Sequence, residues 1–126
     1  MLFWILAGLA VFLLNIYLPA ALYLPTEGVS RHLGPRDTLP EPGVMAARAR
    51  RSLANFQENL PFFLTLGILA LIIEGADMAQ AVLGAQMFVI SRVVYIGLYV
   101  AGVPLLRSAA YMVGLLGCVL MALALV

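Results

Sequence analysis

Three polar residues, Arg51, Asn55 and Glu58, follow one another at intervals of four and three in an otherwise largely apolar stretch. In a helix this spacing places all three on one face, and Arg48 extends that face by one turn. A guanidinium binds carboxylates or phosphates in bidentate fashion, and a carboxylate binds an ammonium group or orders an arginine. The set therefore has the chemistry of a binding site.

A second set, Arg92, Tyr95 and Tyr99, has intervals of three and four and also lies on one helical face. Tyrosine hydroxyl groups donate hydrogen bonds to either kind of ligand group. Together the two sets predict a pocket for a small zwitterionic or anionic molecule, but the residue types alone do not name it. We assign no metal site.

The composition indicates where these helices lie. Of 126 residues, 64% are hydrophobic and 10% are charged, and the mean hydropathy of +1.07 excludes an ordinary soluble domain. Seven arginines against six acidic residues give a net charge of +1, which argues against a nucleic-acid partner. We expect an all-α integral membrane protein in contact with membrane lipids.

The apolar runs predict one membrane domain over residues 1–126, a four-helix transmembrane bundle. At ~1.5 Å per residue, each expected helix is long enough to cross a hydrocarbon core of ~30 Å. The first run lacks the basic start of a cleavable signal peptide, so we expect a retained helix. The helices are expected at about 1–24, 44–75, 78–102 and 104–126, with a polar loop at 25–43 that is rich in proline and glycine.

The distribution of arginine predicts the orientation. Arginines flank the first and third connections, whereas the second connection has none. The positive-inside rule then places loops 25–43 and 102–104 in the cytoplasm and both termini on the other side. The low charge and short connections favour a bacterial inner membrane.

Depth along the helices suggests how the two polar faces meet. Counted from the cytoplasmic ends, Glu58 lies roughly 20 Å deep and Arg92 roughly 15 Å deep, so the two faces overlap in depth and these two residues could meet. A charge near the membrane centre costs about 2.5–3.5 kcal/mol, so such charges must face each other or water. Two simpler interpretations remain: a Glu58–Arg92 pair that only fastens helices, and an Arg51 that reaches the headgroups.

Residues 51–63, Arg-Ser-Leu-Ala-Asn-Phe-Gln-Glu-Asn-Leu-Pro-Phe-Phe, resemble the second-helix signature of the MAPEG family, membrane-associated proteins in eicosanoid and glutathione metabolism. Arg92-Val-Val-Tyr95 with Tyr99 resembles the third-helix motif of that family. Arg107 resembles the arginine at the start of its fourth helix. The likeness covers essentially the whole chain.

This resemblance implies a homotrimer with glutathione as co-substrate, bound in a cleft between subunits that opens to the cytoplasm. It implies a microsomal-type glutathione S-transferase or peroxidase acting on a lipophilic small molecule. Arg107 is then the catalytic residue that stabilises the glutathione thiolate, because a free thiol of pKa ~8.5 is mostly protonated at pH 7. The implied glutathione-binding residues are Arg51, Asn55, Glu58, Arg92, Tyr95 and Tyr99.

Several alternatives stay open at the level of sequence. Arg107 also suits a topology charge at a helix end. The same fold also suits a non-catalytic lipid- or glutathione-binding scaffold. A small proton-coupled exporter usually needs a carboxylate in its first helix, and residues 1–24 have none. We expect Cys118 to be a packing residue, and His32, with Arg31, Arg36 and Asp37, to lie on a solvated loop without a catalytic role.

Overall fold

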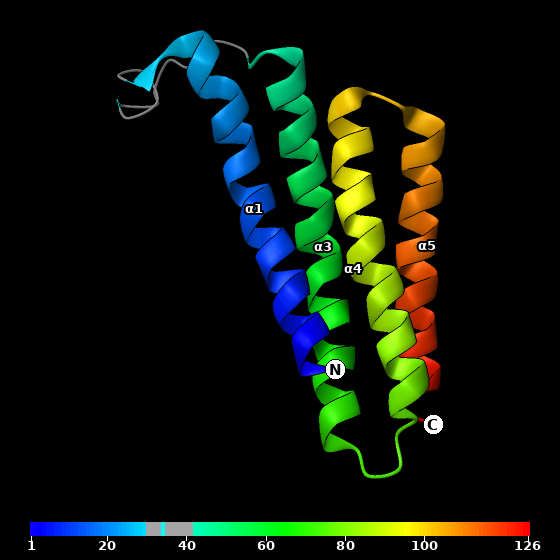
Figure 1. The fold of residues 1–126 in the computed structure, drawn as a ribbon. Helices are drawn as coiled ribbons and strands as arrows, with labels where there is room; N and C mark the ends of the chain where they lie inside the picture. Colours follow the sequence, from blue (N-terminus) through cyan, green and yellow to red (C-terminus); the bar gives the residue numbers. More distant parts are fainter. Residues whose placement is uncertain (30–33, 35–41) are drawn as a thin grey trace.

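The computed structural model describes residues 1–29, 34 and 42–126, and within these ranges it contains four helices and no strand. They are α1 (Leu2–Glu27), α3 (Val44–Ile72), α4 (Met78–Ala101) and α5 (Pro104–Leu123) (Figure 1). The all-α prediction is confirmed. Helix α1 runs three residues beyond the expected end, so Pro25 lies within its last turn.

Three of these helices are long and apolar enough to cross a membrane: α1 over Leu2–Pro25, α4 and α5. Helix α3 is longer still, with 29 residues, but its first half contains the polar face described above. Large apolar side chains such as Phe62, Leu105 and Leu116 are exposed, as expected for a surface in contact with lipid. These features support an integral membrane protein.

The helices lie side by side in the order α1, α3, α4, α5 (Figure 1). Both chain termini lie at one end of the bundle, together with the α3–α4 turn. The end of α1, the start of α3 and the α4–α5 turn lie at the other end (Figure 1). The C-terminal part of α4 and the N-terminal part of α5 therefore share one end with the polar half of α3.

Aromatic rings form the centre of the bundle. Phe63 of α3 stacks on Phe88 of α4, with ring centroids 4.4 Å apart, and Phe12 of α1 meets Phe56 edge to face at 5.3 Å. A Cβ at Gly8 would lie 2.6 Å from a ring carbon of Phe63, so this glycine allows α1 to approach α3. These contacts fix the register of the antiparallel α1–α3 pair.

Glycines also set the distance between α4 and α5. A Cβ added to Gly84 would lie 2.5 Å from the carbonyl oxygen of Gly117, and the reverse substitution gives the same distance. The backbones therefore touch, as small residues allow between membrane helices. This contact aligns α5 against the face of α4 that carries Arg92 and Tyr95.

The end of the bundle that contains the α4–α5 turn is held by that turn and by the side chain of Arg48. Gly102 ends α4 in the left-handed conformation (φ 80°), and Pro104 begins α5 at its first turn. Arg48 of α3 donates from Nη1 to the carbonyl oxygen of Val100 at 3.3 Å. This places a positive charge at the negative end of the α4 dipole and ties α3 to α4.

Candidate functional site

A polar contact between two side chains joins α3 to α4. Arg92 has 1% of its surface exposed, and its Nη1 donates to Oδ1 of Asn55 at 2.8 Å. Among the described residues, its Nε and Nη2 have no hydrogen-bond partner. Within the described part of the chain, Oδ1 of Asn55 therefore accepts the only hydrogen bond that the buried Arg92 guanidinium donates.

Within one chain, Glu58 and Arg92 do not meet. Glu58 is exposed, and Asn55 is the residue that bonds Arg92. Helical geometry gives the reason. Phe56 faces the core, and Glu58, two residues later, points about 200° away from it around the helix. Asn55 lies about 100° from Phe56, at the border of the buried face, and about one turn closer to the depth of Arg92.

Four aromatic rings surround the Arg92 guanidinium. Its central carbon lies 4.9 Å from the ring centroid of Phe88, 5.3 Å from Tyr111, 5.4 Å from Tyr95 and 5.7 Å from Phe56. The negative faces of aromatic rings attract a cation, and they do so more strongly where water is excluded. The rings thus offset part of the cost of burying this charge and fix its position beside Asn55.

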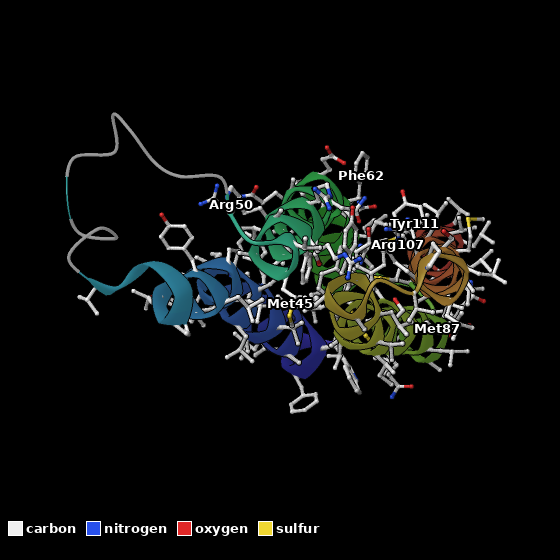
Figure 2. The ribbon with its side chains drawn as sticks, turned by 90° about the horizontal axis from the view of Figure 1, so that it is seen from above. Met45, Arg50, Phe62, Met87, Arg107 and Tyr111 are labelled. Carbon is white, nitrogen blue, oxygen red and sulfur yellow. The ribbon has the colours of Figure 1, made fainter. Side chains whose placement is uncertain are left out.

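A pocket of about 240 Å³ opens next to this contact, between α3, α4 and α5. In the view of Figure 2, Arg107 and Tyr111 lie together in the space between α3 and α5. The pocket is unusually polar for a membrane bundle, since most of its lining side chains carry hydrogen-bonding groups. The lining residues are Asn55, Tyr95, Tyr99, Arg107, Ser108, Tyr111 and Met112.

Arg107 supplies the charge of this pocket. It lies in the first turns of α5, half-buried, with its guanidinium carbon 4.4 Å from the ring centroid of Tyr99. Tyr99 in turn meets Tyr95 edge to face at 5.4 Å. The N-terminal end of a helix carries a partial positive charge, which adds to that of the arginine. The pocket can therefore stabilise an anion.

The structure brings together most, but not all, of the residues that the sequence singled out. Arg92 contacts Asn55 and the ring of Tyr95, and Asn55, Tyr95, Tyr99 and Arg107 line one pocket. Arg51 and Glu58 are exposed on α3 and are not among the lining residues. Within one chain, the polar face of α3 therefore contributes only its middle residue to the pocket.

Sequence reasoning missed Ser108, Tyr111 and Met112. A signal was present for Tyr111, because it follows Arg107 by four residues and so shares its helical face. Arg31, His32, Arg36 and Asp37 lie outside the described residues, so their expected surface role stays a prediction.

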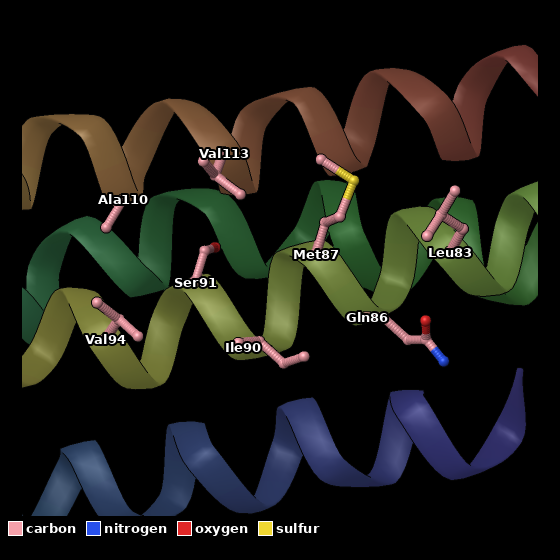
Figure 3. Close-up of a pocket in the computed structure, with 8 residues that line it drawn as sticks. All are labelled: Leu83, Gln86, Met87, Ile90, Ser91, Val94, Ala110 and Val113. Atoms are coloured by element: carbon pink, nitrogen blue, oxygen red, sulfur yellow. The ribbon is translucent and has the colours of Figure 1, made fainter.

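A larger pocket, of about 400 Å³, lies between α4 and α5 and is shown in Figure 3. Its lining is almost wholly apolar, with Leu83, Ile90 and Val113 among the lining residues. The hydroxyl of Ser91 donates to the carbonyl oxygen of Phe88 at 2.8 Å. This pocket is therefore unsuited to a charged ligand.

Comparison with known families gave one result that covers the whole chain. The model of the MAPEG family matches residues 1–126. Searches of curated proteins and of solved structures gave no significant match.

Proposed function

The chain belongs to the MAPEG family, and on that premise we propose that it is a membrane transferase that activates the thiol of glutathione for attack on a lipophilic electrophile. The observation that carries this proposal is the pocket between α3, α4 and α5, which combines a half-buried arginine, three tyrosines and a fixed asparagine. Glutathione is a peptide with two carboxylates, an ammonium group and a thiol, so it needs both donors and a cation.

The residues in and beside the pocket then have three kinds of role. Arg92 holds Oδ1 of Asn55, which leaves the Nδ2 group of Asn55 to donate to a ligand oxygen. Tyr95, Tyr99 and Tyr111 present hydroxyl donors. Arg107 is the catalytic residue, and its charge favours the thiolate over the thiol.

The reaction follows from this charge. The glutathione thiol loses its proton to solvent, and the thiolate remains beside Arg107. Its sulfur forms a bond to an electrophilic carbon of the acceptor. In an addition, the electron pair displaced from the acceptor's double bond takes up a proton. In a substitution, that electron pair departs with the leaving group. With a lipid hydroperoxide as acceptor, two glutathione molecules are oxidised to the disulfide while the peroxide is reduced to an alcohol and water.

The exposed charges of α3 support a site shared between subunits of a homotrimer. Arg51 and Glu58 lie on the same helix face as Asn55, and a charge exposed to hydrocarbon costs about 2.5–3.5 kcal/mol near the membrane centre. A second copy placed over this face removes that exposure and encloses glutathione between the copies. Both residues then bind the charged ends of glutathione, on the cytoplasmic side of a bacterial inner membrane.

The test is calorimetric titration of the detergent-solubilised protein with glutathione. Arg51→Ala and Glu58→Ala should each weaken binding at least tenfold, because each removes a charged contact. The matched control is Arg50→Ala, since Arg50 is also exposed but lies about 100° from Arg51 around α3. Equal affinities in all three variants and the unaltered protein would overturn this assignment.

A further inference from the structure

A second polar site lies outside the glutathione pocket, the name used below for the pocket between α3, α4 and α5. Asn15 lies in the middle of α1 with 1% of its surface exposed, and among the described residues neither its Oδ1 nor its Nδ2 has a hydrogen-bond partner. An amide buried in this way loses its hydration without compensation. Asn15 therefore needs a partner that the described side chains do not supply.

A second unpartnered group lies at the same level. Gly8 meets Phe63 and Phe12 meets Phe56, so the antiparallel register of α1 and α3 brings Ser52 to the level of Asn15. Ser52 is fully buried, and its Oγ has no hydrogen-bond partner within the described residues.

The two side chains together favour a ligand that accepts hydrogen bonds. The amide of Asn15 has two N–H donors and the hydroxyl of Ser52 has one O–H donor. Even if the hydroxyl donates to the amide oxygen, both N–H groups of Asn15 still need acceptors.

An apolar groove gives access to this amide. It lies between α1 and α4, measures about 240 Å³ and is lined by Asn15 with Val11, Leu14, Leu18, Val93 and Ile96. At ~30 Å³ for each water, this volume equals about eight waters, enough for a six-membered ring with short substituents. The groove is lined by α1 and α4, whereas the glutathione pocket is lined by α3, α4 and α5, and the two share no lining residue.

Two obvious partners do not fit. A second protein chain that packs over α1 and α4 meets the exposed apolar side chains that line the groove, such as Leu14 and Val93, before it meets Asn15, which is 1% exposed. The ester carbonyls of phospholipids lie in the interface, whereas Asn15 lies 13 residues from the start of α1 at Leu2, roughly 20 Å along the helix and near the middle of the hydrocarbon. A small molecule whose acceptor oxygen enters the hydrocarbon core meets both conditions.

We propose that the groove between α1 and α4 binds a lipophilic carbonyl compound dissolved in the bilayer, of the quinone or enone class, and that Asn15 donates to its carbonyl oxygen. Ser52, buried at the same level, adds its hydroxyl as a second donor. This site is separate from the glutathione pocket, and the proposal does not depend on glutathione chemistry.

The test uses the protein in lipid nanodiscs and two probes, a short-chain alkylbenzoquinone and the alkylbenzene of the same carbon skeleton. The unaltered protein should bind the quinone at least tenfold more tightly than the alkylbenzene. Asn15→Leu keeps the side-chain size and removes the donors, so quinone affinity should fall to that of the alkylbenzene while glutathione affinity is unchanged. Its melting temperature should be equal or higher, because a buried unpaired amide is replaced by an apolar group of similar shape.

Two results would overturn this proposal. Equal affinity of the unaltered protein for both probes would mean that the groove takes any apolar molecule. A lower melting temperature of Asn15→Leu, combined with unchanged quinone affinity, would mean that Asn15 bonds within the protein. Ser52→Ala provides a second check, and it should weaken quinone binding less than Asn15→Leu does.

Discussion

Two substitutions of Asn55 separate its structural contact from its ligand contact. Asn55→Asp keeps an oxygen that accepts from Nη1 of Arg92, but it removes the Nδ2 donor and adds a negative charge beside the pocket. Asn55→Ala removes both groups. We therefore expect the aspartate variant to fold well but bind glutathione poorly, and the alanine variant to lose both stability and binding.

The magnitude follows from the burial of Arg92. A hydrogen bond to a charged group contributes about 1.5–3 kcal/mol, and Asn55 accepts the only hydrogen bond that Arg92 donates among the described residues. Asn55→Ala should lower the free energy of unfolding by about this amount. Loss of the Nδ2 donor to a glutathione carboxylate involves the same class of bond, so affinity should fall roughly 10- to 100-fold in both variants.

Thermal unfolding in detergent measures the first effect, and calorimetric titration with glutathione measures the second. The reasoning predicts that Asn55→Asp keeps a melting temperature at or above that of the unaltered protein while its glutathione affinity falls. If Asn55→Asp instead bound glutathione as tightly as the unaltered protein, Asn55 would not be a ligand contact. If Asn55→Ala unfolded at an unchanged temperature, the buried hydrogen bond would contribute little.

Two further predictions concern packing around the site. Gly117→Ala should lower the free energy of unfolding by about 1–3 kcal/mol in denaturant unfolding, because the new Cβ would lie 2.5 Å from the Gly84 oxygen. The control is Gly97→Ala, whose new Cβ meets no atom within 4 Å. Equal stability of the two variants would contradict the close contact. Tyr111→Leu should lower the free energy of unfolding by about 0.5–2 kcal/mol, because it removes an aromatic ring from beside Arg92. Tyr111→Phe keeps the ring and should keep that stability. Similar losses in both variants would assign the effect to the hydroxyl instead.

The sequence predicted the helices well because their signals are local. Apolar runs of about 20 residues and the turn residues Gly102 and Pro104 determine where α4 ends and α5 begins. The family resemblance placed Tyr95, Tyr99 and Arg107 in one site, and the structure brings these three side chains to the same pocket.

The partner of Arg92 was not predictable in the same way. Depth arithmetic resolves about one helical turn, and Asn55 and Glu58 differ by less than one turn. What decides between them is rotation about the helix axis, which depends on Phe56 entering the core. The exposure of Arg51 and Glu58 has the same origin. A helix wheel shows which residues share a face, but it does not show which edge of that face is buried.

The Asn15 groove lies further from what a sequence reveals. A lone asparagine in an apolar helix is compatible with many packing roles. Only the register of α1 against α3 brings Ser52 to its level, and only the approach of α1 to α4 creates the adjacent groove. Both depend on contacts between segments that are far apart in the chain.

The central claim is that Arg107 makes the pocket catalytic by holding glutathione as a thiolate. The most direct measurement is the ultraviolet absorbance of the thiolate when the detergent-solubilised protein is titrated with glutathione near pH 7, where free glutathione is mostly protonated because its thiol pKa is ~8.5. The account predicts strong thiolate absorbance with the unaltered protein and its loss in Arg107→Met, while calorimetry still detects glutathione binding to that variant. Bound glutathione without thiolate absorbance in the unaltered protein, or undiminished absorbance in Arg107→Met, would contradict it.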